Sequence, residues 1–434
     1  MQLYSTNNPN LRVSFQEAIF KGLPDDKGLY MPLEIQMLPK DFVYGLSARS
    51  FQEISFIVAK GLLQGAMPDI DLERIIQKSI NFPAPVIRLD DKTYVLELFH
   101  GPSLAFKDFG ARFMSQVMSY FNRGEDKKLT ILVATSGDTG GAVAAGFFQT
   151  PGIEVVILYP SGKVSSLQEK QLTTLGHNVV ALEVDGTFDD CQNLVKRAFL
   201  DPDIIRQMRL SSANSINISR LIPQTFYYFE AYKQIEKRIG LVTNVVFSVP
   251  SGNFGNLTAG ILAKRMGLPV HQFIAATNTN DVVPEYLEKG IYAPQVSKRT
   301  LSNAMDVGDP SNFARMLGLY CSTWNNMTRD ITGYGFSDDA TRGSMREIDS
   351  KYGYTMDPHG AVGYLALRKY QKKQPFSGII LETAHPAKFV EDVEKILERR
   401  ITIPDSFVVL AKKEKKSVKM TKKYEDFKEW LLHH

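Results

Sequence analysis

The sequence predicts an α/β protein built from two parallel-sheet domains and an additional N-terminal domain. The chain has 434 residues, which is too many for one compact core and indicates two or three domains. Short apolar segments repeatedly lead into a glycine-rich turn and then into a segment with helical spacing. Continuous apolar strands that alternate with helices are typical of parallel sheets covered on both faces.

The N-terminal part, residues 1 to about 90, has a different pattern from the rest of the chain. Apolar residues recur at helical spacing in residues 49–63 and again in residues 72–80. The stretch Asn81-Phe-Pro-Ala-Pro85 ends this pattern, because proline has no backbone N–H and keeps the preceding residue extended. We therefore expect a domain boundary just after it.

Beyond this boundary, apolar strands and helices alternate. The expected strands are residues 129–134, 153–159, 178–184, 245–249, 273–276 and 378–381. We assign residues 1–90 to the N-terminal domain, 91–128 and 230–434 to a large α/β domain, and 129–229 to a small α/β domain. Because an open α/β sheet binds ligands at the carboxyl ends of its strands, the turns that begin at Thr135, Ser251 and Glu382 are the expected places for chemistry.

Composition excludes several classes of protein. Hydrophobic residues make up 44% and charged residues 23% of the chain, which is typical of a globular protein and not of a disordered one. The net charge is only +4. Acidic residues are interspersed with the lysines that begin at Lys412, so we interpret this segment as solvated surface rather than a nucleic-acid or membrane site. Two distant cysteines, Cys191 and Cys321, indicate no metal site and a reducing, cytoplasmic setting. Neither a signal peptide nor a membrane-spanning apolar run is expected.

The segment Ser251-Gly-Asn-Phe-Gly-Asn256 follows an expected strand and opens an expected helix. Its two glycines let backbone N–H groups approach an anion at the helix N-terminus, and its two asparagines add side-chain donors. A tight turn with a helix cap would explain either glycine alone, but the combination favours phosphate binding. Neither common glycine pattern for nucleotides is present, so the segment indicates a phosphorylated cofactor or substrate.

Three further segments carry polar groups that fit a ligand site. The turn Thr135-Ser-Gly-Asp-Thr-Gly-Gly141 suits a substrate carboxylate or, equally, a plain helix cap. The segment Asn214-Ser-Ile-Asn-Ile-Ser-Arg220 ends in an arginine that suits phosphate or carboxylate, but it also fits an exposed loop. Lys107 has aromatic neighbours that would lower its pKa and free its amine for imine formation, yet a lysine beside an aspartate also fits a surface ion pair.

Taken in chain order, the sequence resembles threonine synthase, in the form that carries a long N-terminal extension. The segments that carry the resemblance are HGPSLAFKDFGARFM, ATSGDTGGAVA, SANSINISRLIPQ, VPSGNFGNLTAG and LETAHPAKF, and the match covers nearly the whole chain. The resemblance implies fold type II of the pyridoxal-phosphate enzymes, with the cofactor between two α/β domains and bound mainly by the large one. It also implies the reaction of O-phospho-L-homoserine with water to give L-threonine and phosphate, the last step of threonine biosynthesis.

The resemblance further assigns a role to each segment. Lys107 would hold pyridoxal phosphate as a Schiff base and move protons at the substrate Cα and Cβ, Thr383 would meet the pyridine nitrogen, and Asp138 would lie near the 3-oxygen. The remaining cofactor contacts would come from Ser251, Gly252, Asn253, Phe254, Gly255 and Asn256. The substrate carboxylate would be held by Thr135, Ser136 and Thr139, and the substrate phosphate by Asn214, Ser215 and Arg220.

Two alternative functions stay open from the sequence. A phospholyase of the same fold would need the same lysine and phosphate contacts but would yield a keto acid. A non-catalytic protein that binds pyridoxal phosphate is disfavoured by Lys107 together with the hydroxyl-rich turn at residues 135–139. The segment Asp357-Pro-His-Gly360 matches the family loosely, so His359 receives no role. The protein is expected as a monomer or a homodimer, without a nucleic-acid or membrane partner.

Overall fold

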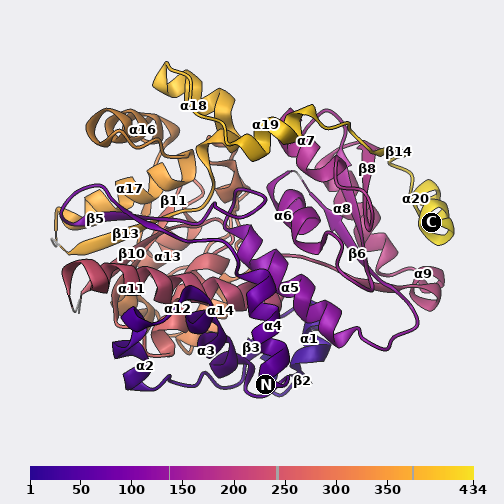
Figure 1. Cartoon of the computed structure of the whole chain (residues 1–434), viewed down its shortest axis with the longest axis horizontal. Coiled ribbons are helices and arrows are strands. Elements are labelled where there is room, and N and C mark those ends of the chain that lie inside the picture. Colours follow the sequence, from indigo (N-terminus) through magenta and orange to yellow (C-terminus); the bar gives the residue numbers. More distant parts are fainter. Residues whose placement is uncertain (136, 241–243, 374–375) are drawn as a thin grey trace.

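Three sheets organise the part of the chain that the computed structural model describes (Figure 1). The described residues are 1–135, 137–240, 244–373 and 376–434, with the backbone alone at Asp138 and Ile239. A six-stranded sheet has the order β12-β11-β10-β13-β5-β4, and a five-stranded sheet has the order β14-β8-β7-β6-β9. A three-stranded sheet, β2-β1-β3, belongs to the N-terminal part.

The six-stranded sheet is parallel except at one edge, where β4 runs antiparallel to β5. Its strands are β4 (Val86–Arg88), β5 (Thr93–Glu97), β10 (Val245–Pro250), β11 (Val270–Thr277), β12 (Ile331–Gly335) and β13 (Ser377–Glu382). Neighbouring residues face different cores: Val246 packs with α17 (Pro358–Gln371), and Phe247 belongs to the core that includes α12 (Gly255–Arg265). The sheet is therefore covered on both faces, as its continuous apolar strands predict.

The five-stranded sheet is parallel throughout. Its strands are β6 (Leu129–Ala134), β7 (Ile153–Pro160), β8 (Val179–Asp185), β9 (Arg209–Ser211) and β14 (Val418–Thr421). The helices connected to it are α6 (Asp138–Phe147), α7 (Ser166–Thr173), α8 (Phe188–Ala198) and α9 (Pro202–Gln207).

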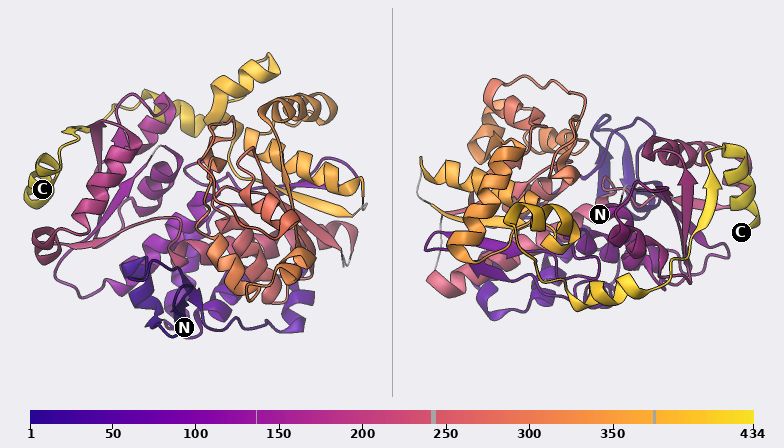
Figure 2. Two further views of the ribbon diagram at one scale, coloured as in Figure 1. Left: turned by 180° about the vertical axis from the view of Figure 1, so that it is seen from behind. Right: turned by 90° about the horizontal axis from the view of Figure 1, so that it is seen from above.

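The C-terminal segment leaves the lobe of the six-stranded sheet and crosses to the other lobe (Figure 2). β14 pairs with β8, and α20 (Tyr424–His433) comes next in the chain, so residues 418–433 join the smaller unit and not the large domain to which the sequence assigned them. The physical reason is the burial of apolar side chains, because Met420 and Phe427 pack in one core with Leu182. The remaining domain boundaries stay predictions.

The N-terminal part shares its core with the rest of the molecule. It contains β1 (Gln2–Ser5), β2 (Arg12–Ser14), β3 (Tyr30–Pro32), α1 (Phe15–Lys21), α2 (Lys40–Tyr44), α3 (Phe51–Leu63) and α4 (Asp69–Ser79). The last two helices are those that the sequence predicts, and α3 begins with a capping box between Ser50 and Glu53. Ile54 of α3 lies in one continuous core with Phe109 and Phe226.

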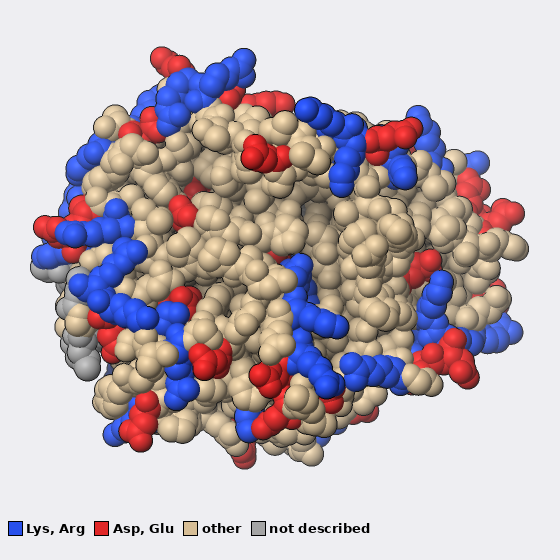
Figure 3. Space-filling model, in the orientation of Figure 1, with Lys and Arg blue, Asp and Glu red and all other residues tan. Residues whose placement is uncertain are grey.

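The remaining helices surround the two lobes. They are α5 (Lys107–Phe121), α10 (Ile218–Leu221), α11 (Phe226–Ile239), α13 (Val282–Lys289), α14 (Phe313–Leu319), α15 (Trp324–Asp330), α16 (Asp338–Tyr352), α18 (Val390–Leu397) and α19 (Asp405–Lys412). Within the described ranges, no helix has the length and apolar character that a membrane span requires. On the face in Figure 3, basic and acidic side chains alternate around the rim.

Candidate active site

A cavity of about 450 Å³ lies between the two α/β units. Lys107 at the start of α5 lines it, together with the turn after β10 and Thr383 after β13. Thr139 of α6 and Phe188 of α8 line it from the unit of the five-stranded sheet. The turns after β10 and β13 and the first turn of α6 thus meet at the carboxyl ends of parallel strands, where an α/β sheet binds its ligands.

Backbone contacts hold Lys107 beside Thr383, although the two are far apart in the sequence. The N–H of Phe106 donates to the carbonyl of Thr383 at 2.9 Å, and the N–H of His385 donates to the carbonyl of Leu104 at 3.0 Å. Lys107 is half-buried in the cavity wall. The neighbouring Asp108 is fully buried, which raises its pKa to about 6. The predicted alternative of a surface pair between these two residues therefore does not describe this segment.

The turn from Ser251 to Asn256 is held in one shape by close contacts. Phe254 adopts a left-handed conformation with φ of 59°, and a Cβ at Gly252 would lie 2.7 Å from the carbonyl oxygen of Ala304. The carbonyl of Asn253 accepts a hydrogen bond from the Asn312 amide at 2.9 Å. These contacts bring the turn to the cavity with little freedom to move.

Asn256 carries the clearest sign of a candidate anion site in this turn. Its side chain is 5% exposed, and its Oδ1 accepts hydrogen bonds from the hydroxyls of Tyr227 at 2.7 Å and Tyr228 at 2.9 Å. Its Nδ2 is buried and has no hydrogen-bond partner among the described residues. A buried donor without a partner costs about 1–3 kcal/mol, so an acceptor such as the phosphate of pyridoxal phosphate fits here.

Arg220 is a second candidate anion position in the same cavity. Its guanidinium is 3% exposed and donates from Nη1 to the carbonyl of Ala213 at 2.7 Å, while its Nε has no partner within the described ranges. Burial lowers its pKa to about 10, so the group is a cation at neutral pH. None of the carboxylates that the structure describes forms an ion pair with it. A buried cation without a counter-ion favours an anionic ligand.

The structure brings together some of the remaining predicted residues and not others. Ser215 and Thr139 line the cavity. Thr135 does not: its hydroxyl accepts the backbone N–H groups of Gly137 at 3.0 Å and Gly140 at 2.9 Å. Asn214 is exposed, also away from the lining. Ser136 lies outside the described residues, as does the side chain of Asp138, and the ligand contacts of all these residues stay predictions.

Several residues that shape the cavity carry no local signal in the sequence. Tyr227 and Tyr228 lie in α11 with the spacing of ordinary core residues. Asn312 lies at the end of a long irregular segment, and Gln224 lies in the 3-10 helix Ile222–Thr225 that follows the helix of Arg220. His359 lies in the Asp357-Pro-His-Gly360 segment, which the family resemblance matches only loosely, and it lines the cavity. Each reaches the site only through tertiary contacts.

Three family models match consecutive parts of the chain. The model described as "Pyridoxal-phosphate dependent enzyme" matches residues 80–380, "Threonine synthase N terminus" matches residues 2–80, and "Threonine synthase, C-terminal" matches residues 360–431. The threonine synthase of Haemophilus influenzae is 47% identical over 408 residues, which are 94% of this chain and 93% of that protein.

Solved structures agree with the family models. The crystal structure of threonine synthase from Escherichia coli matches with a TM-score of 0.89 at 42% identity, over 100% of both chains. The PLP-bound threonine synthase from Brucella melitensis matches with a TM-score of 0.94 at 33% identity, over 100% of this chain and 99% of that one.

The fold, the cavity and these matches define a pyridoxal-phosphate-dependent lyase of fold type II. The chain belongs to the threonine synthase family, and its activity is that of a threonine synthase. The predicted fold, cofactor and activity are thereby confirmed. Among the described residues, no group of three or more His, Cys, Asp or Glu side chains is placed to hold a metal ion.

Proposed function

We propose that the substrate is O-phospho-L-homoserine and that the enzyme uses water to convert it to L-threonine and phosphate. The observation that carries this proposal is the second anion position at Arg220. The turn from Ser251 to Asn256 accounts for the phosphate of the cofactor, so the buried guanidinium of Arg220 is left for a phosphate on the substrate. An arginine suits this task because its planar group can donate two hydrogen bonds to one phosphate.

The residues around the cavity have complementary tasks in this reaction. Pyridoxal phosphate, when bound, supplies an electron sink for the substrate carbon atoms that lose protons. The amine of Lys107 takes protons from Cα and then Cβ and returns protons as the product forms. Thr383 is adjacent to Lys107 through the backbone contact with Phe106, so its hydroxyl is available to the pyridine nitrogen. Arg220 holds the phosphate that leaves Cγ.

Water then adds at Cβ, where its oxygen becomes the hydroxyl of threonine. The phosphate that remains beside Arg220 can take the proton that this water loses, because a phosphate dianion is a base near neutral pH. Retention of the released phosphate would therefore decide between hydration to threonine and loss of the intermediate as a keto acid.

The direct test is to incubate the purified holoenzyme with O-phospho-L-homoserine and to measure threonine, phosphate and 2-oxobutanoate together. We expect threonine and phosphate in equal amounts. Phosphate together with the keto acid would instead identify a phospholyase. Cofactor absorbance without turnover would identify a non-catalytic cofactor-binding protein.

The substitution Arg220→Gln tests the phosphate contact. We expect kcat/KM to fall by roughly two orders of magnitude or more, because loss of one partner from a buried charged contact costs several kcal/mol. The turnover that remains should give more keto acid per phosphate released than the wild type gives. Arg206→Gln is the control, since Arg206 is an exposed residue paired with Asp203. Normal activity and normal product ratio in Arg220→Gln would contradict the proposed role.

A further inference from the structure

A buried group of three ionisable residues lies beside the cavity, and the proposed reaction does not use it. Asp357, His359 and Glu382 are 0%, 3% and 0% exposed. Asp357 caps α17, His359 lies in the first turn of that helix, and Glu382 ends β13 immediately before Thr383. His359 and Thr383 both line the cavity.

The hydrogen bonds of His359 define the tautomer of its ring. The backbone N–H of Ala304 donates to Nε2 of His359 at 3.2 Å, so Nε2 must be the unprotonated nitrogen. Nδ1 lies 2.7 Å from Oδ1 of Asp357 and therefore carries the proton that it donates to that carboxylate. His359 is consequently a neutral ring whose two nitrogens are both engaged.

Glu382 is the third member of this buried group and contacts Asp357. Its Oε1 accepts the backbone N–H of Asp357 at 2.7 Å. Burial and the nearby charge of Asp357 raise the pKa of Glu382 well above its usual value, which disfavours a second negative charge in this group. A Cβ at Gly360 would lie only 1.5 Å from Oε2 of Glu382, so glycine is the residue that allows this close packing.

The partner of His359, Ala304, packs directly on the anion-binding turn. A Cβ at Gly252 would lie 2.7 Å from both the carbonyl oxygen of Ala304 and the Cα of Met305. Ala304 and Met305 also line the cavity. The hydrogen bond from Ala304 to His359 thus connects the turn that holds the phosphate with the helix beside Thr383.

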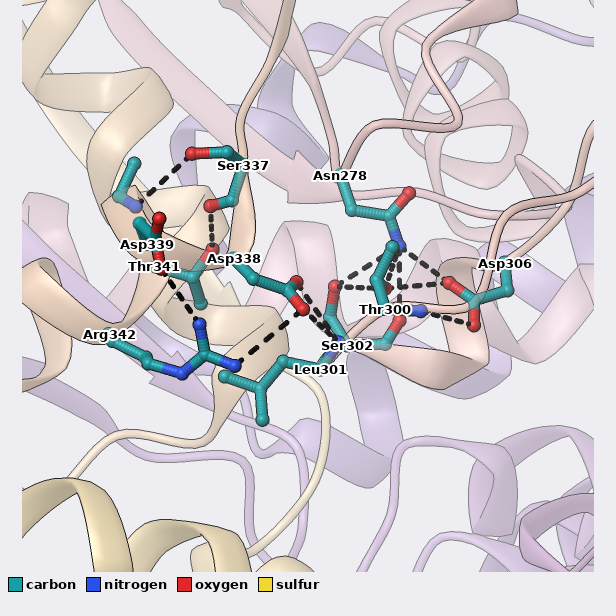
Figure 4. A network of polar contacts seen from close by, with 11 residues as sticks. Asn278, Thr300, Leu301, Ser302, Asp306, Ser337, Asp338, Asp339, Thr341 and Arg342 are labelled. Carbon is teal, nitrogen blue, oxygen red and sulfur yellow. Dashed lines mark hydrogen bonds and ion pairs between the residues drawn. The ribbon is translucent and has the colours of Figure 1, made fainter.

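The segment that carries Ala304 has a second attachment, at Thr300 and Asp306 on either side of the short helix Asn303–Met305. Figure 4 shows Asn278, Thr300 and Asp306 pointing toward one another. The Asn278 amide donates to Oγ1 of Thr300 at 2.7 Å and to Oδ1 of Asp306 at 3.0 Å, and Thr300 donates to Oδ1 of Asp306 at 2.6 Å. The short helix Asn303–Met305 is thus attached at two places, and the hydrogen bond to His359 is the attachment that Ala304 itself makes.

We propose that His359 is a positioning residue, which holds Ala304 and Met305 against Gly252 and thereby sets the distance between the anion-binding turn and Thr383. Pyridoxal phosphate must reach the turn with its phosphate and Thr383 with its ring nitrogen. A fixed spacing between these two places selects a cofactor of this length and keeps its ring in one orientation.

Two substitutions of His359 separate its two hydrogen bonds. His359→Gln places an amide oxygen near the position of Nε2, where it can accept from Ala304. His359→Asn places an amide near the position of Nδ1, where it can meet Asp357 but cannot reach Ala304. We expect His359→Asn to weaken cofactor binding about tenfold or more and His359→Gln to rescue most of it, since one hydrogen bond of this kind changes an equilibrium by about tenfold.

Two measurements other than activity test this expectation. Cofactor titration, followed through the absorbance of the bound cofactor, gives the dissociation constant. Amide hydrogen exchange on the holoenzyme reports the Ala304 N–H, which should exchange about tenfold faster in His359→Asn than in wild type or His359→Gln. His177→Asn is the control, because His177 is exposed and its left-handed backbone, with φ of 55°, suits asparagine.

The outcomes that overturn the proposal are specific. Equal loss of cofactor affinity in both variants would show that the ring matters for its packing and not for the bond to Ala304. Wild-type affinity in His359→Asn would show that the bond has no effect on the cofactor. If His359→Asn does not fold, His359→Gln still decides: slow exchange at Ala304 with wild-type affinity supports the proposal, and fast exchange with wild-type affinity contradicts it.

Discussion

Two tyrosine hydroxyls determine which way the Asn256 amide points. Tyr227 and Tyr228 are fully buried, and burial raises the pKa of both well above the usual value, so both keep their protons and can donate. Oδ1 of Asn256 accepts from Tyr227 at 2.7 Å and shares the Tyr228 hydroxyl with the backbone carbonyl of Asn256, each at 2.9 Å, which leaves Nδ2 as the group without a partner among the described residues. The turn contributes Asn256 itself. The tyrosines of α11 orient its amide so that Nδ2 is available to donate.

Asn256→Asp tests this orientation with almost no change in shape. The aspartate can still accept from both tyrosines, but it replaces the donor at Nδ2 with an oxygen that repels phosphate. We expect cofactor affinity to fall by about 100-fold, because a favourable charged hydrogen bond of about 1.5–3 kcal/mol is lost. Cofactor titration measures the effect, and Asn325→Asp on the exposed surface of α15 is the control. Unchanged affinity would place the phosphate elsewhere.

The residues of the site that could be predicted are those whose neighbours in sequence are also their neighbours in space. The turn from Ser251 to Asn256 is of this kind, because its glycines and asparagines lie in one loop that lines the cavity. Tyr228 and His359 are of the other kind. Each resembles a core residue in its own helix, and its effect depends on a partner that only the tertiary fold brings close.

A similar contrast applies to the strands. A strand inside a sheet could be predicted from its sequence, whereas the edge strand β14 could not. β6 spans Leu129–Ala134, as the sequence predicts, because a strand buried on both faces is almost wholly apolar. β14 was not predicted, since it lies in a lysine-rich segment and contributes a single buried side chain, that of Met420. An edge strand needs few apolar residues, so its composition resembles that of a solvated loop.

Lys415 provides a polar attachment for this C-terminal segment. Its amine lies 2.7 Å from a carboxylate oxygen of Glu169 and 2.8 Å from one of Glu183. The hydrogen bond from Lys415 is the largest of the causes that lower the pKa of Glu183 to about 2. The prediction that these lysines form solvated surface holds for exposed residues such as Lys419. Lys415 is instead half-buried and pairs with two carboxylates.

Lys415→Gln should therefore make stability less dependent on pH in acid. A carboxyl whose folded pKa lies below its unfolded value contributes stability above the unfolded value, and this contribution is lost as the pH falls through the folded pKa. For Glu183 the window extends from its ordinary value of 4.5 down to about 2. We expect Lys415→Gln to lower the unfolding free energy by about 0.5–1 kcal/mol at pH 7, with the difference shrinking across that window.

Urea unfolding at several pH values, followed through tryptophan fluorescence, measures this difference, because Trp430 lies in α20. Lys419→Gln is the control, since Lys419 belongs to the same strand and is exposed. A difference between wild type and Lys415→Gln that stays constant from pH 7 to the acid end of the window would show that Glu183 does not depend on Lys415 for its low pKa.

For the molecule as a whole, one buried arginine connects the N-terminal part to the active site. Arg315 is 0% exposed and donates to the carbonyl of Tyr30 from Nε at 3.2 Å and from Nη2 at 3.0 Å. It also donates to the carbonyl of Ile216 at 2.6 Å and to Oδ1 of Asn312 at 2.8 Å. Asn312 in turn donates to the carbonyl of Asn253 in the turn from Ser251 to Asn256. Hydrogen bonds through Arg315 and Asn312 thus connect the N-terminal sheet with that turn.

Arg315→Met should weaken both the fold and the site. The methionine fills much of the space but leaves the carbonyls of Tyr30 and Ile216 buried without donors, which should lower the unfolding free energy by about 2–5 kcal/mol. Asn312 would lose the contact that orients it toward Asn253, so cofactor affinity should fall even in conditions where the variant is fully folded. Chemical unfolding and cofactor titration measure the two effects separately.

Arg315→Lys separates charge from geometry in the same position. It restores the positive charge, but a single ammonium cannot reach three acceptors that surround a planar guanidinium. We expect Arg315→Lys to recover part of the stability and little of the cofactor affinity. Arg265→Met is the control, since Arg265 is exposed and donates to the carbonyl of Leu319 at the end of α14. Full recovery of cofactor affinity in Arg315→Lys would show that the site needs a positive charge at this position. The planar guanidinium that holds Asn312 in place would then not be required.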